Sequence, residues 1–425
     1  MKRLKHAASI PALTLAFAHA AFAAGKICDV HTFGAKGDGT TRDTAAIQRA
    51  IDECAAAKGG GTVKLAGGTF VSAPIVLKSG VTLDVEKGAT LLGSPDHADY
   101  PAKSEFRAPG YQALVSATNA EHIAILGGGT IDGAGESWWK QARTQKNAGV
   151  LGSENSRPRL VVFDHCKHVR IEDVTIQNSP MWQVVPYYSD DVVIRNVRIL
   201  ADPHSPNTDA IDPFSSTHVL IDHVYADVGD DDIAIKSGMI DSPGPDSPSA
   251  DITITDCEFH HGHGLSIGSE IAGGAQRVRA ERIHFVGTDN GLRIKANRDR
   301  GNDVSAIVFK DITMEDVKVA VLISEYYPKA LPEGAVETAP ITRLTPHFHD
   351  ITIENLTAKN SAWAGVVIGL PEAPVAAVTL KNVSIEAKRG MTFAYASVKA
   401  EGLHVVVSDG GKPVTTMPTA TLTGN

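Results

Sequence analysis

The segment Val169-Arg170-Ile171-Glu172-Asp173 decides the fold, because copies of it recur along most of the chain. Each copy has two aliphatic residues separated by one residue, and a polar residue, usually Asp or Asn, closes it. The third residues of the copies are 23, 27, 33, 26, 29, 44 and 27 positions apart, at Ile171, Ile194, Ile221, Ile254, Ala280, Phe309, Ile353 and Leu380. Looser copies extend the series upstream at 63–65, 81–83 and 123–125.

A repeat of mostly 23 to 33 residues, built from short alternating strands with frequent Gly and Asn, is typical of a solenoid. Leucine-rich repeats share this period, but their consensus is rich in Leu, whereas these copies prefer Ile and Val. The sequence therefore predicts an all-β chain, a single-domain right-handed parallel β-helix of about ten coils. Stacked coils place equivalent residues on neighbouring strands about 4.8 Å apart.

One helix is predicted near the N-terminus of this stack. Thr41–Thr44 opens it, its apolar face is Ile47, Ala50, Ile51 and Cys54, and Gly59–Gly61 ends it. An amphipathic helix at this position would cover the unpaired strands of the first coil, so we interpret it as the N-terminal cap. At the other end, the Thr-rich tail from about Thr415 is expected to be loosely ordered.

The first 23 residues are typical of a signal peptide. Lys2, Arg3 and Lys5 precede the apolar stretch 10–21, and Ala21-Phe22-Ala23 supplies the cleavage pattern. We expect residues 24–425 to form the β-helix domain of a secreted protein, either extracellular or periplasmic. No later segment is apolar for long enough to span a bilayer.

The charge of the chain argues against nucleic acid as a partner. Lys+Arg 40 against Asp+Glu 49 gives −9, and removal of the three basic leader residues makes this −9 − 3 = −12. Binding of nucleic acid needs a basic surface that neutralises phosphates. We expect a monomer that requires neither a membrane nor a nucleic acid.

Four cysteines remain after cleavage, and export permits disulfides with three connectivities. Cys28 and Cys54 flank the predicted helix and can form a disulfide bridge with each other. Cys166 and Cys257 are alternatively buried free thiols. No C-x-x-C pair is present, which argues against a cysteine zinc site.

The second strands of four coils can also be aligned, over residues 209–212, 231–236, 263–268 and 290–295. In this register one position is occupied on consecutive coils by Asp209, Asp231, His263 and Asn290, and Asp230 directly precedes Asp231. Arg293 and Lys295 alternate with apolar neighbours, so both cations are expected to point outward.

Three carboxylates a few ångströms apart repel one another, so at least one is expected to have a raised pKa. With a histidine beside them and two cations on the next coil, they suit hydrolysis of a uronic-acid glycoside without a cofactor or metal. Each motif alone has a simpler interpretation. Gly229–Asp232 can be a solvated acidic turn or a calcium ligand set, Gly262–Gly264 a tight turn, and the two cations solvated surface residues. Their coincidence in one register favours a catalytic site.

These motifs resemble those of glycoside hydrolase family 28, the polygalacturonases. The four signatures of that family stand in order as Asn207-Thr208-Asp209, Gly229-Asp230-Asp231, Gly262-His263-Gly264 and Arg293-Ile294-Lys295. The resemblance covers nearly the whole mature chain, including the opening Phe33–Gly39.

The resemblance implies a role for each residue. Asp230 is implied as the general acid, Asp209 and Asp231 as the pair that activates water, and His263 as the group that adjusts their protonation. Arg293 and Lys295 are implied to bind a galacturonate carboxylate, Arg through a bidentate contact and Lys as a point charge.

The chain departs from the family pattern at two positions. Ala210 stands where the first signature usually has Gly, and Val319 stands where many members have a tyrosine. Tyr326 or Tyr327 is an alternative source of that hydroxyl group. Trp138, Trp139 and Trp182 are interpreted as packing residues rather than sugar platforms.

The expected reaction is hydrolysis of α-1,4-galacturonosyl linkages in pectin or polygalacturonic acid, with inversion at the anomeric carbon. Endo cleavage is favoured over exo, although insertions near 141–158 and 329–346 can wall off one end of a groove. A pectate lyase that uses calcium, and a non-catalytic β-helix adhesin or glycan-binding module, are the competing interpretations. A sister hydrolase of rhamnogalacturonan fits the two cations less well.

Overall fold

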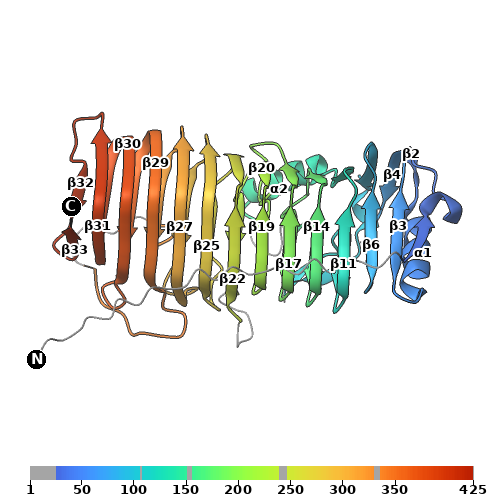
Figure 1. The fold of residues 1–425 in the computed structure, drawn as a ribbon, viewed down its shortest axis with the longest axis horizontal. Coiled ribbons are helices and arrows are strands. Elements are labelled where there is room, and N and C mark those ends of the chain that lie inside the picture. Colours follow the sequence, from blue (N-terminus) through green and yellow to red (C-terminus); the bar gives the residue numbers. More distant parts are fainter. Residues whose placement is uncertain (1–24, 106–107, 151–155, 239–246, 330–335, 425) are drawn as a thin grey trace, which may run out of the picture.

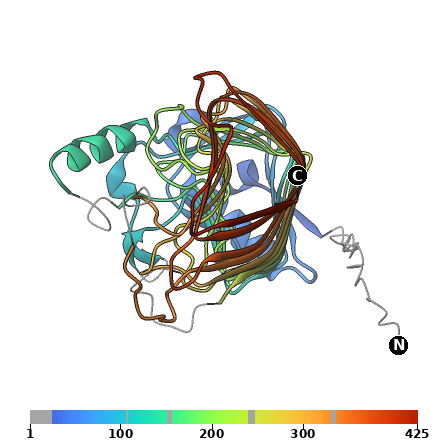
Figure 2. The same ribbon diagram turned by 90° about the vertical axis from the view of Figure 1, so that its left-hand side faces the viewer.

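The computed structural model describes residues 25–105, 108–150, 156–238, 247–329 and 336–424. The chain winds into a right-handed parallel β-helix, an elongated stack of coils with the N-terminal coil at one end and the C-terminal coil at the other (Figure 1). Seen along the stack, the strands of successive coils superpose (Figure 2). The predicted fold class is therefore confirmed, whereas the predicted signal peptide, residues 1–23, lies outside the described residues.

Three ladders of strands run along the stack. The longest ladder contains β1 (Lys26–Asp29), β3 (Gly61–Leu65), β6 (Val81–Val85), β11 (Glu121–Leu126), β14 (Lys167–Glu172), β17 (Asp190–Arg195), β19 (Thr217–Asp222), β22 (Ser249–Thr255), β25 (Ala275–Val286), β27 (Asp303–Glu315), β29 (His347–Ile368), β30 (Val375–Ala394), β31 (Ala396–Val407) and β33 (Thr421–Gly424). The second ladder contains β2 (Asp38–Arg42), β4 (Gly68–Ser72), β7 (Ala89–Gly93), β12 (Thr130–Asp132), β15 (Thr175–Gln177), β18 (Arg198–Leu200), β20 (Tyr225–Val228) and β23 (Glu258–His261), and then joins β25. The third ladder contains β5 (Ile75–Val76), β10 (Val115–Thr118), β13 (Val161–Asp164), β16 (Val184–Tyr187), β21 (Ile233–Ile235), β24 (Leu265–Gly268), β26 (Asn290–Lys295) and β28 (Val319–Ser324), and continues through the later parts of β29 and β30 to β32 (Val414–Thr416).

The sequence repeat corresponds to the longest ladder. The third residues of the eight full copies pair with one another in succession as Cα partners, from Ile171 with Ile194 to Ile353 with Leu380. Only the first loose copy is displaced, because Val63 rather than Leu65 pairs with Leu83. These apolar side chains point inward and form one continuous core.

The polar residue that closes each copy has a conformational reason. It adopts a left-handed backbone conformation with φ between 50° and 59° in every full copy, at Asp173, Asn196, His223, Asp256, Arg282, Asp311, Asn355 and Asn382. Asn and Asp tolerate this region better than most residues. Neighbouring closing residues also pair across coils: Asn355 Nδ2 donates to Asp311 Oδ1 at 2.7 Å, and Asn382 Nδ2 donates to Asn355 Oδ1 at 3.1 Å. In the first four copies this residue separates two strands of the coil, whereas in the last four it lies within one long strand, β25, β27, β29 or β30.

The predicted cap is helix α1 (Thr44–Ala56), at the N-terminal end of the stack (Figure 1). The apolar face expected from the sequence is buried. Cys54 of this helix forms a disulfide with Cys28 of β1, which links the cap to the first coil. Cys166 and Cys257 are buried free thiols, as the alternative interpretation had it.

The C-terminal prediction was wrong. The tail from Thr415 adds strands to the stack, because β32 pairs with β30 and β33 pairs with β31. The stack is correspondingly longer than the copies recognised in the sequence. A terminal coil contacts one neighbour only, so its sequence can lose the apolar alternation while its backbone still pairs.

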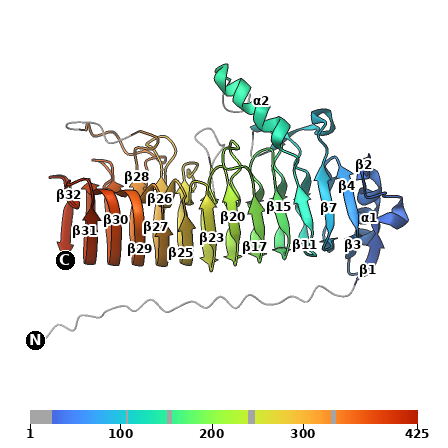
Figure 3. The same cartoon turned by 90° about the horizontal axis from the view of Figure 1, so that it is seen from above.

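The remaining elements lie outside the ladders. They are the 3₁₀ turns η1 (Val30–Phe33) and η2 (His97–Asp99), the antiparallel pair β8 (Ala102–Glu105) and β9 (Ala108–Tyr111), and helix α2 (Glu136–Asn147). Helix α2 projects from the stack (Figure 3). Trp138 and Trp139 of this helix are buried, with Trp138 stacked on His97, which confirms their packing role. Within the part of the chain that is described, no helix combines the length and apolarity that crossing a membrane requires.

Candidate active site

The third ladder confirms the register expected for the polar motifs. Ile211, Ile233, Leu265 and Leu292 are successive partners, so the residues two positions earlier share one position on consecutive coils. Those earlier residues are Asp209, Asp231, His263 and Asn290. Val319 pairs directly with Asn290, which confirms its predicted place in the same column.

Asp231 is buried between two cations. Its Oδ1 accepts hydrogen bonds from the Arg293 guanidinium and, at 3.0 Å, from the Ser266 hydroxyl, and its Oδ2 accepts one of 2.9 Å from Lys295 Nζ. Burial alone raises the pKa of Asp231, but the charges of Arg293, Lys295 and Lys236 more than offset it and hold the pKa well below its usual range. Asp231 is therefore ionised at neutral and mildly acidic pH.

Asp209 has the opposite environment. It is buried, and the cation nearest to it is Lys236, whose Nζ lies 3.6 Å from Asp209 Oδ2, 3.6 Å from Asp212 Oδ1 and 3.1 Å from Glu270 Oε2. Burial, followed by the charges of Asp230 and Asp212, raises the pKa of Asp209 well above its usual value. Burial likewise raises the pKa of Asp212 to about 7. The raised pKa predicted for the stacked carboxylates thus lies on Asp209.

Asp230 and His263 form a pair at the surface of the site. Asp230 is half-buried, and His263 Nδ1 lies 2.9 Å from its Oδ1, which also accepts the Asp231 backbone N–H at 2.9 Å. Burial lowers the pKa of His263, but its bond to Asp230 and the charges of Asp230 and Asp231 raise it overall above its ordinary value. The pair can therefore hold a proton at the edge of the cluster.

Asn207 and Arg157 form a chain of hydrogen bonds that positions Asp230. Asn207 Nδ2 donates to Asp230 Oδ2 at 3.4 Å, and Arg157 donates to Asn207 Oδ1 at 2.7 Å. The buried Arg157 also donates to the backbone carbonyls of Pro180 and Pro206, at 2.8 and 2.7 Å. The first residue of the Asn-Thr-Asp signature therefore positions the carboxylate of the second signature.

The structure rules out two of the simpler interpretations of these motifs. Arg293 and Lys295 lie on the outer side of the coil, opposite the core residues Leu292 and Ile294, but they are only 6% and 5% exposed and both bind Asp231. They are therefore not solvated surface cations. The run 229–232 is not a solvated acidic turn either, because Asp231 and Asp232 are buried.

Several residues of the site were not identified from the sequence. Lys236 occupies the same position on its coil as Lys295 does two coils later. Ile235 pairs with Ile267, so Lys236 aligns with Gly268, which pairs with Lys295. The aligned sequence segments therefore already indicated Lys236. Glu270 and Arg157 lie outside the ladder strands, and no spacing pattern indicates them. Trp182 packs under the site, with Lys236 Nζ 4.8 Å from its ring centroid, in agreement with its predicted packing role.

Of the two alternative tyrosines, Tyr327 lies beside the site. Lys295 Nζ is 5.2 Å from the centroid of its ring. Tyr326 is buried and packs in a separate apolar cluster with residues such as Ile368 and Leu370. An aromatic ring therefore flanks Lys295, although the column position itself is occupied by Val319.

Comparisons with known proteins agree with this arrangement. A family model described as glycosyl hydrolases family 28 matches residues 55–402. The chain belongs to this family. It is 33% identical to an endo-polygalacturonase from Pectobacterium carotovorum subsp. carotovorum, over 82% of this chain and 85% of that protein. It is 29% identical to a polygalacturonase from Ralstonia solanacearum, over 80% of this chain and 72% of that protein.

A solved structure shows the same likeness. The crystal structure of an exopolygalacturonase from Thermotoga maritima matches with a TM-score of 0.72 and 27% identity, over 93% of this chain and 90% of that chain. Relatives of this family-28 chain thus include both endo- and exo-acting proteins.

Proposed function

We propose that this protein is a polygalacturonase, which hydrolyses α-1,4-galacturonosyl linkages in pectin or polygalacturonic acid. The observation that carries the proposal is the cluster on the third ladder, where Asp209, Asp230 and Asp231 meet His263, Arg293 and Lys295. The cluster contains the half-buried carboxyl group of Asp230. It also contains two buried carboxyl groups whose pKa values are shifted in opposite directions, upward for Asp209 and downward for Asp231. Its cations provide positive charge for an anionic sugar. Membership of family 28 supports the same function.

We assign the general acid to Asp230. It is more exposed than Asp209 and Asp231, and His263 lies within hydrogen-bond distance of it. Because the pKa of His263 is raised, the proton of the pair can rest on the imidazole, and it passes across the 2.9 Å contact to Asp230 as the leaving glycosidic oxygen takes a proton from Asp230. His263 is accordingly a group that maintains the protonation of the acid.

Asp231 and Asp209 are assigned to the attacking water. Asp231 is ionised, because Arg293 and Lys295 hold its pKa low, and it can accept a hydrogen bond from water. Asp209 is assigned as the base that takes one proton from that water as it attacks. It can do so only in its ionised form, which the charge of Lys236 favours. Lys236 is therefore assigned as a residue that positions and ionises Asp209.

Arg293 and Lys295 are assigned to the substrate carboxylate as well as to Asp231. An Arg side chain has five N–H donors, and here Asp231 and Ser266 occupy two of its three nitrogens. Galacturonate is an anion and the chain is acidic overall, so a local positive site is needed to bind it.

The product assay separates this function from its competitors. Hydrolysis of polygalacturonate releases reducing ends without forming an unsaturated, ultraviolet-absorbing sugar, and it continues in the presence of a chelator. A pectate lyase would form the unsaturated product and stop in chelator, whereas an adhesin or glycan-binding module would bind the polymer without new reducing ends. Either of those outcomes would remove the proposal.

We favour endo cleavage, supported by 33% sequence identity to an endo-polygalacturonase against 29% to an exo-acting relative aligned in the same way. Endo action predicts oligomers of many sizes during the first few per cent of digestion. Products that are only monomer or dimer from the outset would assign the exo mode instead.

Secretion is proposed from the predicted signal peptide, residues 1–23. The Cys28–Cys54 disulfide supports it, because such bonds persist mainly in oxidising compartments. N-terminal sequencing of the exported protein is expected to begin at Ala24.

The stereochemical outcome is expected to be inversion. Two carboxyl groups, Asp209 and Asp231, on neighbouring coils can hold a water, while Asp230 delivers its proton to the leaving oxygen. Proton NMR of the first-formed product should then show β-anomeric reducing ends from the α-linked polymer. An initial α-anomer would mean that no water is held between these carboxylates.

Replacement of the buried lysine should change the pH dependence. In Lys236→Met, Asp209 loses the positive charge that lowers its pKa, so its pKa rises further and the ionised form is lost at higher pH. The acidic limb of kcat/KM is expected to move to higher pH, and each unit of displacement lowers the rate on that limb tenfold. The matched control is Lys399→Met, which breaks the exposed pair with Glu401 and should leave the profile unchanged. An unchanged acidic limb in Lys236→Met would show that Asp209 does not titrate in catalysis.

A further inference from the structure

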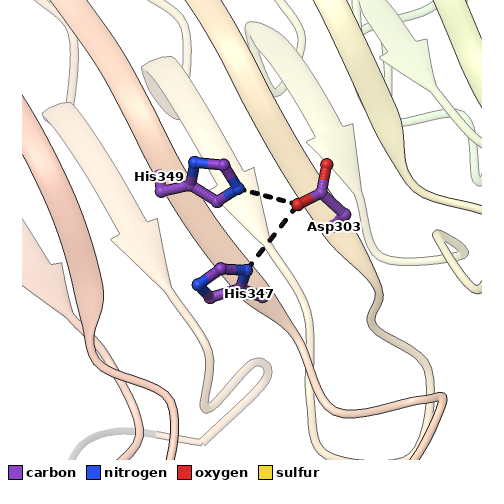
Figure 4. Close-up of side chains that lie close together, drawn as sticks. All are labelled: Asp303, His347 and His349. Atoms are coloured by element: carbon purple, nitrogen blue, oxygen red, sulfur yellow. Dashed lines mark hydrogen bonds and ion pairs between the residues drawn. The ribbon is translucent and has the colours of Figure 1, made fainter.

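A second group of ionisable side chains lies on the outer surface where two adjacent strands begin. Strand β27 starts at Asp303 and strand β29 at His347, and these two residues are Cα partners. The sequence His347-Phe348-His349 alternates, so Phe348 enters the core and both histidines remain on the outer side, next to Asp303 (Figure 4).

The three side chains converge on one point. Asp303 Oδ1 lies 2.7 Å from His349 Nε2 and 3.7 Å from His347 Nδ1, and one ligand atom from each of the three lies within 4.8 Å of the others. Tetrahedral zinc with bonds of about 2.0–2.1 Å places its ligand atoms about 3.3 Å apart. The Asp303–His349 separation is shorter than that value and the Asp303–His347 separation is longer, each by about half an ångström, so small side-chain rotations bring these atoms to ligand spacing.

Hydrogen bonds behind the cluster hold the ligands in orientation. His349 Nδ1, on the far side of the ring from Asp303, lies 2.8 Å from Asp350 Oδ2. Asp303 Oδ2 accepts hydrogen bonds from Ser305 Oγ at 2.7 Å and Gln276 Nε2 at 3.1 Å, which directs Oδ1 toward the histidines. A carboxylate behind a histidine and fixed carboxylate ligands are the outer partners that protein metal sites have.

Two other groups with comparable spacing are already neutralised by cations. Asp222 and Asp256, which flank His223, are hydrogen-bonded by Arg195 and Arg282, each at 2.8 Å. The group of the candidate active site contains Asp231, which Arg293 and Lys295 bind. Within the described ranges, Asp303 has no ion pair with a lysine or arginine, and its ion-pair partners are His347 and His349.

We propose that Asp303, His347 and His349 form a binding site for a divalent transition-metal ion of the zinc type. Two imidazoles and one carboxylate suit zinc or copper, whereas calcium and magnesium take oxygen ligands. Three protein ligands leave one position for water. The ion joins the coils of β27 and β29 and stabilises the stack there, independently of the proposed hydrolysis. The absence of C-x-x-C pairs does not bear on this site, because it uses no cysteine.

The test is metal binding by the full-length mature protein without an affinity tag. After treatment with chelator and its removal, titration with ZnCl₂ in a calorimeter should show one ion per chain and raise the thermal midpoint, while CaCl₂ should do neither. His347→Ala, His349→Ala and Asp303→Asn should each abolish binding or weaken it at least about tenfold. Asp350→Ala, which removes the outer carboxylate, should weaken binding by about 10–100-fold.

The matched control is His404→Ala, which removes an exposed histidine on β31 that belongs to none of these groups. It should bind zinc as the wild type does. The absence of binding at 1:1 stoichiometry in the wild type, or equal binding by wild type and the His347→Ala and His349→Ala variants, would overturn the site. Because His347 is exposed and His349 only half-buried, the chelator-treated variants are expected to unfold at temperatures close to that of the chelator-treated wild type. If His347→Ala fails to fold, His347→Gln replaces it in the same comparison.

Discussion

Asp230→Asn is expected to lower the rate of polygalacturonate hydrolysis by about 10²–10⁴-fold, the contribution of general acid catalysis, while leaving the fold intact. The amide has nearly the shape of the carboxyl group but cannot donate an acidic proton to the departing oxygen. The charge and hydrogen bond that raise the pKa of His263 are weakened by the same substitution. Initial rates of reducing-end release measure the first effect, and NMR titration of the His263 ring should show a lower pKa.

The matched control for this variant is Asp227→Asn. Asp227 lies three residues upstream in β20 and contacts His261 at 2.8 Å, much as Asp230 contacts His263 at 2.9 Å. It should keep wild-type activity. If Asp230→Asn keeps more than about a tenth of the wild-type rate, well above the range for loss of a general acid, another group is the proton donor.

Arg293→Ala is expected to abolish activity and to destabilise the protein. Breaking a buried ion pair by removing one partner costs about 3–5 kcal/mol, because the other charge stays buried. Asp231 is 1% exposed, and Lys295 then remains as the cation that contacts it directly. The pKa of Asp231 is expected to rise, so the carboxylate assigned to water is lost along with the contact to substrate.

Two comparisons separate these effects. A residue that only binds the substrate carboxylate would matter less on methyl-esterified pectin, where that charge is absent, whereas loss of the Asp231 partner should reduce hydrolysis of both polymers. Arg282→Ala is the matched control, since Arg282 binds Asp256 across neighbouring coils but in an exposed position, where such a pair contributes about 0–1 kcal/mol. A loss confined to the unesterified polymer, with unchanged unfolding in denaturant, would assign Arg293 to substrate alone.

Local sequence was sufficient for the architecture apart from the C-terminal coil, whose strands β32 and β33 lack the apolar alternation. The alternation of Val169 and Ile171 and the polar residue that closes each copy reflect two local requirements, an inward-facing side chain and a left-handed turn. Both depend on short-range geometry, so each coil encodes them independently and their repetition reveals the stack. The same reasoning placed Asp209, Asp231 and His263 in one column, because the register of a parallel stack follows from the aligned apolar residues.

Tertiary structure alone decided the electrostatics of the site. The sequence presents Asp209 and Asp231 as equivalent, yet one is held ionised by Arg293 and Lys295 while burial raises the pKa of the other. The sign of such a shift depends on which cations reach which oxygen, and these come from other coils, up to 64 residues away in the chain. Loop residues such as Glu270 follow no repeat, so only the folded chain shows that Lys236 contacts them. Spacing therefore determines which residues meet, whereas burial and the distances between charges determine how each of them titrates.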